Sequence, residues 1–160
     1  MQTTGFAKPT PPGWPRMSSA LYCENAREAI AWYVRAFGFT VEIIVDAPDG
    51  SVMHSEIRYG EAMVMVTEGS AEREARFGIT GRAPKAIGGV NTQTLFLYVD
   101  DVDAHCAQAR AAGANVTYEL SDNDYGAEYW CDRSYGCVDP DGHLWWISQR
   151  LRNPPGHPAP

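Results

Sequence analysis

Three polar side chains that can do chemistry together alternate along one short segment. His54, Glu56 and Arg58 are spaced two residues apart in VMHSEIRY, so on a β-strand they would share one face. Such a set offers an imidazole that moves a proton, a carboxylate that acts as base or acceptor, and a guanidinium that holds an anion. The alternative is an ordinary exposed polar face of a strand. If the protein is an enzyme, His54 and Glu56 are the expected catalytic pair.

Other candidate residues favour a structural interpretation over a chemical one. His143 follows the DPDG turn at 139–142 and is expected to close that turn by hydrogen bonding. Asp132 and Arg133 are expected to form a structural ion pair, and His105 is expected at the surface of its helix. Neither G-x-x-x-x-G-K-[ST] nor G-x-G-x-x-G occurs, so no motif indicates nucleotide binding.

The four cysteines form no C-x-x-C pair. We expect them to be reduced and structural, which is typical of a cytoplasmic protein, with a Cys131–Cys137 disulfide as the alternative. The segment MQTTGFAKPTPPGWPR lacks the apolar stretch of a secretory signal, and no window is apolar for long enough to span a membrane. Net charge is −7 without a basic cluster, which argues against a nucleic-acid or anionic-membrane partner.

The elements that must position these side chains run in the same order twice. Asn25 is placed to cap a helix over 26–37 and Gly38 to end it, while Asp101 and Gly113 do the same for 102–112. Alternation and turn residues predict strands over 17–23, 40–46, 52–59, 62–68, 92–100, 115–120, 129–138 and 143–151. Residues 121–128 are expected to form a loop.

Five identities support an internal repeat at an offset of 75 residues. Ala29, Arg35, Ala36, Gly38 and Val41 are repeated as Ala104, Arg110, Ala111, Gly113 and Val116. The prediction is an α+β protein with two βαβββ modules, 17–68 and 92–151, joined by a linker over 69–91 with a short helix at 71–76. The proline-rich tails, 1–16 and 152–160, are expected outside the core, with Phe6 and Trp14 attaching the first tail.

Several motifs in these modules resemble the vicinal oxygen chelate superfamily, which includes glyoxalase I, extradiol dioxygenases and bleomycin-resistance proteins. They are AREAIAWYVRAFGF in the first half, and LYVDDVDAHCAQARAAGANV and VDPDGHLWWI in the second. Two further stretches, VMHSEIRYGEAMVMVTE and DRSYGCVDPDGHLWW, resemble the PhnB-like branch. The resemblance implies a half-barrel cleft between paired modules and frequently a homodimer.

In metal-dependent members of this superfamily, His, Gln or Glu ligands lie on the first and last strands of each module. The corresponding positions here are Ser18, Met65, Thr94 and Trp146. None of these side chains replaces a carboxylate or imidazole as a ligand for a divalent ion. The resemblance therefore implies a cleft without a metal or other cofactor, and it leaves open whether the protein is an enzyme.

Strand alternation extends these positions to a predicted lining that suits a small, flat organic ligand. The predicted ligand-binding residues are Ser18, Tyr22, Met63, Met65, Thr94, Phe96, Tyr98 and Trp146. Three functions remain open. The first is a metal-free binding protein for a small, aromatic molecule. The second is a lyase or dioxygenase-type enzyme with an unusual metal or acid–base site near His54 and Glu56. The third is a dimeric interaction protein whose cleft is filled by its own side chains.

Overall fold

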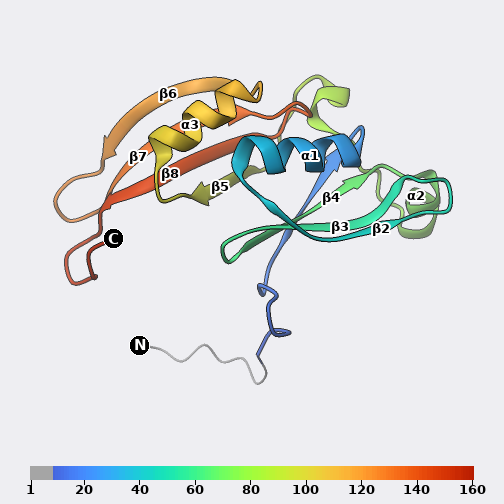
Figure 1. Cartoon of the computed structure of the whole chain (residues 1–160), viewed down its shortest axis with the longest axis horizontal. Helices are drawn as coiled ribbons and strands as arrows, with labels where there is room; N and C mark the ends of the chain where they lie inside the picture. Colours follow the sequence, from blue (N-terminus) through green and yellow to red (C-terminus); the bar gives the residue numbers. More distant parts are fainter. Residues whose placement is uncertain (1–8) are drawn as a thin grey trace.

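The computed structural model describes residues 9–160, which form two four-stranded mixed sheets with a helix packed on each (Figure 1). The first module consists of β1 (Ser19–Cys23), α1 (Ala26–Phe37), β2 (Thr40–Asp46), β3 (Val52–Tyr59) and β4 (Ala62–Glu68). The second consists of β5 (Thr94–Tyr98), α3 (Val102–Ala111), β6 (Asn115–Asp124), β7 (Cys131–Val138) and β8 (Leu144–Arg152). The predicted fold class, with its two βαβββ modules, is confirmed.

Both modules have the same topology. The sheet orders are β1-β4-β3-β2 and β5-β8-β7-β6, and in each sheet the first strand runs parallel to the last. The side-chain oxygens of Asn25 and Asp101 accept hydrogen bonds from the backbone N–H of Glu28 and Ala104, so both predicted helix caps are present. Gly38 takes a left-handed conformation at the end of α1, as expected.

The connection between the modules contains two short helices, α2 (Ala71–Phe77) and a 3₁₀ turn over Pro84–Ile87. The 3₁₀ turn was not predicted, because its four residues carry no period long enough to see. Gly81 lies so close to Tyr22 of β1 that a Cβ there would be 1.9 Å from the ring. The connection is therefore fitted against the first sheet at a position where only glycine has room.

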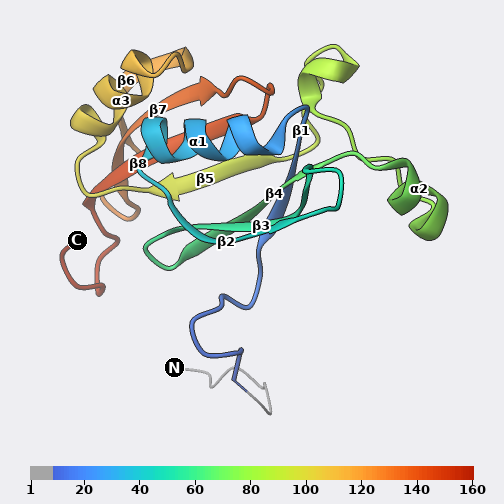
Figure 2. The same ribbon diagram turned by 45° about the vertical axis from the view of Figure 1, so that its right-hand side comes forward.

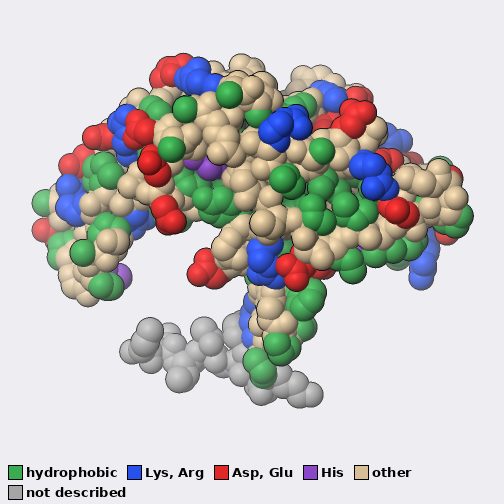
Figure 3. Space-filling view, viewed as in Figure 1, with side chains coloured by type: hydrophobic (Ala, Val, Ile, Leu, Met, Phe, Trp, Pro, Cys, Tyr) green, Lys and Arg blue, Asp and Glu red, His purple; other side chains and the backbone are tan. Residues whose placement is uncertain are grey.

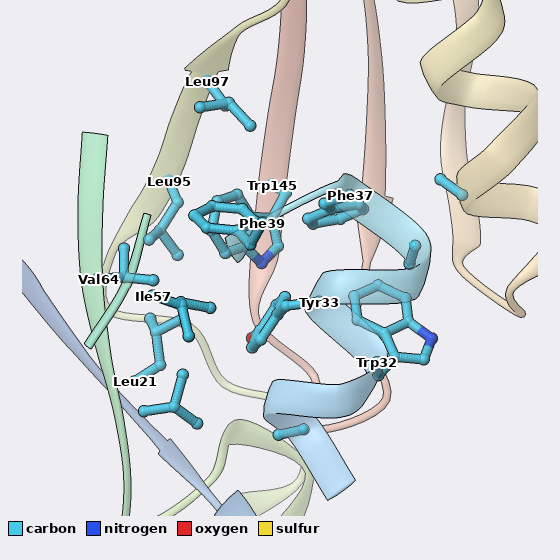
Figure 4. Close-up of a cluster of buried hydrophobic side chains, with 14 of the residues drawn as sticks. Leu21, Trp32, Tyr33, Phe37, Phe39, Ile57, Val64, Leu95, Leu97 and Trp145 are labelled. Atoms are coloured by element: carbon cyan, nitrogen blue, oxygen red, sulfur yellow. The ribbon is translucent and has the colours of Figure 1, made fainter. Parts of the chain in front are cut away.

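A single hydrophobic core joins the modules, with α1 between the two sheets (Figure 2). Trp145 of β8 meets Tyr33 and Phe37 of α1, with ring centroids 5.7 and 5.2 Å apart. Figure 4 shows these rings together with side chains from both sheets, among them Leu21, Ile57, Val64, Leu95 and Leu97. The two sheets therefore hold each other in place through α1.

Asp139 of the DPDG turn is the polar centre of this junction. Its buried carboxylate accepts hydrogen bonds from Tyr33 Oη at 2.5 Å, Trp145 Nε1 at 3.1 Å, and the backbone N–H groups of Asp141 and His143. His143 also closes the turn with Asp139 through its backbone carbonyl, and its Nε2 lies 3.0 Å from the Tyr22 carbonyl oxygen. The predicted turn-closing role of His143 is confirmed, and its ring also ties the turn to β1.

His105 was predicted at the surface, and this is wrong. The ring is only 8% exposed, because α3 packs against α1. Its Nε2 lies 3.2 Å from the Phe37 carbonyl oxygen and its Nδ1 lies 2.8 Å from Tyr135 Oη. A carbonyl only accepts, so Nε2 carries the proton and Nδ1 accepts from the tyrosine. Burial lowers the pKa of His105, which keeps this neutral form.

Two other expectations were wrong. Residues 121–124, expected in a loop, continue β6 to Asp124, because β7 supplies partners along that length. Cys131 and Cys137 lie on the same strand, so they cannot form the alternative disulfide, and all four cysteines are free and buried. Phe6 and the first half of the N-terminal tail lie outside the described residues.

Candidate functional site

A cavity of about 610 Å³ lies on the face of the second sheet that is turned away from the helices. Aromatic side chains form its walls and a small polar group forms its base. The lining residues are Phe96, Tyr98, Asn123, Tyr125, Trp130, Asp132, Ser134, Trp146, Arg150, Asn153, Pro154 and His157. A mostly apolar cavity with a few polar groups at one place is the usual form of a small-molecule site.

Strand alternation separates the walls of this cavity from the core. On β5, Leu95 and Leu97 are buried in the core, whereas Phe96 and Tyr98 are exposed on the outward face. On β8, the neighbouring residues Trp145 and Trp146 divide in the same way. Alternate residues therefore go to the core and to the cavity, both in LFLY (95–98) and in the pair WW (145–146).

Trp146 has space above the sheet because its partner on β7 is Gly136. A Cβ on Gly136 would lie 3.7 Å from the Trp146 ring and 3.2 Å from the Cβ of Tyr118. The rings of Tyr118 and Trp146 have centroids 4.9 Å apart. Glycine thus lets two aromatic side chains meet over β7, and Trp146 is held in position before any ligand arrives.

The polar base of the cavity is built around Arg150. Its Nε donates to Asp132 Oδ1 at 2.5 Å, and another of its nitrogens donates to Tyr98 Oη. Burial, followed by the Asp132 carboxylate, raises the pKa of Tyr98, so the phenol keeps its proton at neutral pH. The hydroxyls of Ser134 and Ser148 are 2.8 Å apart and buried beside this group.

The prediction that Asp132 and Arg133 form an ion pair is wrong, because the two side chains lie on opposite faces of β7. Consecutive residues of a strand point to opposite faces, so Asp132 faces the cavity and pairs with Arg150. Arg133 faces the helix side, where it pairs with Asp103 of α3 and Asp122 of β6.

The structure divides the predicted ligand-binding residues into two groups. Phe96, Tyr98 and Trp146 line the cavity, and Thr94 is an exposed residue of the same strand, β5, at a position outside the cavity lining. The others lie away from this lining: Tyr22, Met63 and Met65 are on the first sheet, and Ser18 directly precedes β1. Their role stays a prediction.

The first sheet carries His54, Glu56 and Arg58 on β3, and each of them makes a polar contact with a nearby residue. His54 Nε2 is 3.3 Å from Glu56 Oε1, and the other Glu56 oxygen accepts a hydrogen bond of 2.8 Å from Trp14 Nε1. Arg58 pairs with Glu42 and donates to the Gly13 carbonyl oxygen. The N-terminal segment is therefore attached through Trp14, and it occupies one oxygen of the predicted catalytic carboxylate.

The positions that hold metal ligands in metal-dependent members do not fit a metal ion here. A hydroxyl, a thioether, a second hydroxyl and an indole are present, at Ser18, Met65, Thr94 and Trp146. Among residues 9–160, no group of three or more His, Cys, Asp or Glu side chains is placed to hold a metal ion. A site for a hard or borderline divalent ion needs such a group, so the residues at these positions do not fit one.

Sequence reasoning missed the residues that close the cavity from the side. Tyr125 and Trp130 come from the β6–β7 hairpin, and Asn153, Pro154 and His157 come from the C-terminal tail. A strand pattern could not show that the hairpin turns toward the outward face. The tail was expected to lie outside the core because it is rich in proline, and that composition gives no sign of a cavity wall.

Comparison with known proteins identifies the family to which this architecture belongs. The family model of the Glyoxalase/Bleomycin resistance protein/Dioxygenase superfamily matches residues 17–147. The chain therefore belongs to this superfamily. An uncharacterized protein of Mycobacterium tuberculosis is 35% identical over 139 residues, which cover 86% of this chain and 76% of that protein.

Two solved structures are also similar. TioX from Micromonospora sp. ML1 has a TM-score of 0.65 and 28% identity, covering 86% of this chain and 99% of TioX. TnmS3, an antibiotic binding protein from Streptomyces sp. CB03234, has a TM-score of 0.54 and 18% identity, covering 83% of this chain and 93% of TnmS3. The second likeness shows the fold alone. No helix among residues 9–160 is long and apolar enough to cross a membrane.

Proposed function

We propose that the protein binds a small, flat aromatic molecule in the cavity on the second sheet, without a metal ion. The observation that supports this most directly is the preformed wall of Trp146, Phe96 and Trp130 around a volume of about 610 Å³. Stacking on a ring that is already held in place costs little side-chain entropy. Burying one face of such a ring favours binding by a few kcal/mol before association costs, so a micromolar Kd is expected (~1 µM to ~100 µM).

The charges in the lining favour an uncharged ligand. Besides the imidazole of His157, the lining contains one carboxylate and one guanidinium, those of Asp132 and Arg150, and these already form an ion pair. An anionic ligand would have to lose its hydration and compete with Asp132 for the guanidinium, which is costly in a partly buried site. The ligand we propose therefore carries neutral oxygens, such as carbonyl or hydroxyl groups, beside an aromatic plane.

Two fluorescent probes of the same skeleton test both parts of this proposal. N-phenyl-1-naphthylamine is uncharged, and 1-anilinonaphthalene-8-sulfonate adds a sulfonate to the same rings. We expect the uncharged probe to bind more tightly to the wild-type chain. Trp146→Ala should weaken its binding by about tenfold or more, which corresponds to ~1.4 kcal/mol.

The matched control is Phe77→Ala, an exposed aromatic residue of α2 that is remote from the cavity lining. It should leave the Kd of N-phenyl-1-naphthylamine within about twofold of wild type. Equal binding by wild type and Trp146→Ala would refute the aromatic wall. A metal ion bound tightly and stoichiometrically to the purified protein would instead favour the hypothesis that the protein is an enzyme.

We also propose that the chain forms a homodimer. Large apolar side chains are exposed on both modules, including Met17 at 84% and Met53 at 53% in the first. In Figure 3, hydrophobic side chains gather in the middle of the visible face. A partner would cover such side chains, and the half-buried Met65 of the first sheet would then take part in the cleft of the dimer, whereas Met63 is already buried within one chain. Light scattering coupled to gel filtration tests this, and a monomer at micromolar concentration would refute it.

We also propose a cytoplasmic location and a place in the PhnB-like branch. The four free, buried cysteines support a cytoplasmic location, because thiols persist in reducing compartments. The segments VMHSEIRYGEAMVMVTE and DRSYGCVDPDGHLWW support the PhnB-like branch of the superfamily.

The enzyme remains a second candidate because His54 and Glu56 stand 3.3 Å apart, as an acid–base pair would. Its test is a substrate panel in which His54→Gln and Glu56→Gln abolish turnover. Unchanged turnover in both variants would remove the pair from consideration. The third candidate, an interaction protein with a filled cleft, requires that no probe enters the cavity.

A further inference from the structure

The C-terminal tail after β8 turns back beside the second sheet instead of leaving the molecule (Figure 1). Asn153, Pro154 and His157 line the cavity that contains Trp146. Pro160 lines an adjoining groove, which shares Phe96, Tyr98 and Arg150 with the cavity. The tail thus runs from one hollow to the next along the same wall, and we refer to residues 153–160 as the strap.

The strap is joined to the polar base of the cavity by one residue. Arg150 Nη1 donates to Asn153 Oδ1 at 2.8 Å, while the same guanidinium contacts Asp132 and Tyr98. The guanidinium carbon also lies 5.7 Å from the centre of the Trp130 ring. Arg150 therefore connects the strap, the base and the hairpin wall, and its five N–H groups suit this role because they lie in one rigid plane.

The strap also has internal features that hold its shape. Asn153 Nδ2 donates to the Pro158 carbonyl oxygen at 2.7 Å, and the His157 N–H donates to the Pro154 carbonyl oxygen at 3.2 Å. Four of its eight residues are proline, at 154, 155, 158 and 160. Proline limits the conformations that a free tail would sample, so closing the strap costs less entropy than closing a tail of ordinary composition.

We propose that the strap is part of the ligand site and sets which aromatic molecules the cavity accepts. The proposal rests on the proposed function. A flat ligand stacked on Trp146 meets Pro154 and His157 at the side of the cavity, so the strap adds contact area and limits ligand width. Without the strap the same ligand keeps its stacking partner and loses a wall.

Three variants test this. One chain ends at Arg152 and lacks the strap, a second carries Asn153→Ala, and Asn115→Ala is the control at an exposed asparagine of β6. Removal of the strap should weaken binding of N-phenyl-1-naphthylamine by about fivefold to thirtyfold, and Asn153→Ala should weaken it by about threefold or more. Asn115→Ala should leave it unchanged. If the shortened chain fails to fold, Asn153→Ala alone decides.

A second measurement needs no ligand. The indole N–H signals of Trp130 and Trp146 should shift in the ¹H–¹⁵N spectrum when the strap is removed, whereas those of Trp32 and Trp145, which belong to the core, should not. If the Trp130 and Trp146 signals do not shift, the strap proposal is refuted, even if no probe binds at all.

The outcomes separate the two proposals. If Trp146→Ala abolishes binding and both strap variants bind within about twofold of wild type, the strap proposal fails and the proposed function stands. If the wild-type chain binds neither naphthyl probe, the proposed function fails, and the indole signals alone decide whether the strap packs on the cavity.

Discussion

Asp139→Asn should destabilise the protein more than any conservative change at a surface carboxylate. Both oxygens of Asp139 are occupied: Oδ1 accepts from two backbone N–H groups, and Oδ2 accepts from Tyr33 Oη and Trp145 Nε1. In asparagine, the oxygen can stay with the two backbone groups, and the amide N–H₂ then replaces Oδ2. The Tyr33 hydroxyl can rotate and accept from this amide.

The indole of Trp145 has no such alternative, because it only donates. Its buried N–H would face another donor, which costs about 1–3 kcal/mol for an unsatisfied group. The other three hydrogen bonds lose the assistance of a full negative charge, at about 0.5–1 kcal/mol each. The expected loss in the free energy of unfolding is therefore about 2.5–6 kcal/mol.

Urea unfolding followed by tryptophan fluorescence measures this change. Tyr33→Phe should cost about 1.5–3 kcal/mol, because it removes one charge-assisted bond and leaves the carboxylate with three. Asp46→Asn, at an exposed ion pair with Arg27, is the control and should cost under ~1 kcal/mol. A loss below about 1 kcal/mol for Asp139→Asn would refute the assignment of Asp139 as the polar centre of the junction.

Three further predictions concern other parts of the structure. Burial lowers the pKa of His105, so below about pH 6.5 the unfolded chain takes up the proton first and stability falls with falling pH; the slope of Tm against pH between pH 7 and 5 should be smaller in His105→Gln, and an equal slope would contradict this. Gly81→Ala should loosen the connection between the modules, because the new Cβ would collide with the Tyr22 ring; faster hydrogen exchange over residues 69–91 measures it, and wild-type exchange would count against it. Burial raises the pKa of the Cys137 thiol to about 12, so this thiol should not react with a disulfide reagent at pH 8 until the protein unfolds; a rapid reaction of folded protein, mapped to Cys137 by mass spectrometry, would show the burial to be wrong.

The architecture was readable from the sequence because its signals are local. Asn25 and Asp101 mark the helix starts by their capping oxygens, and the 52–59 and 62–68 strands are bounded by turn residues on both sides. The end of β6 was not readable, because Ser121 to Asp124 form a strand only where β7 lies beside them. These partners follow directly across the β6–β7 hairpin, but the polar composition of residues 121–124 has a low strand propensity, which does not reveal the pairing.

The candidate site was only partly predictable. The predictable part consists of strand residues, whose side chains alternate between the two faces of a sheet. Alternation correctly places Phe96, Tyr98 and Trp146 on one face of the second sheet. Met65 entered the predicted lining through the resemblance, and its role stays a prediction, because the pattern of one strand does not say which sheet faces which. That relation is decided by how α1 packs between the sheets, through contacts such as those of Trp145 with Phe37.

The closing walls show a second limit of sequence reasoning. Arg150 falls within the predicted 143–151 strand and no role was predicted for it, yet it contacts Asp132, Tyr98 and Asn153 at one point. Nothing in the spacing of these four residues predicts their meeting, since they come from β5, β7, β8 and the tail. A guanidinium with several donors in a plane brings such elements together by geometry. If the strap variants behave as expected, the specificity of this cavity depends on tertiary contacts of a tail whose composition alone indicates only a segment outside the core.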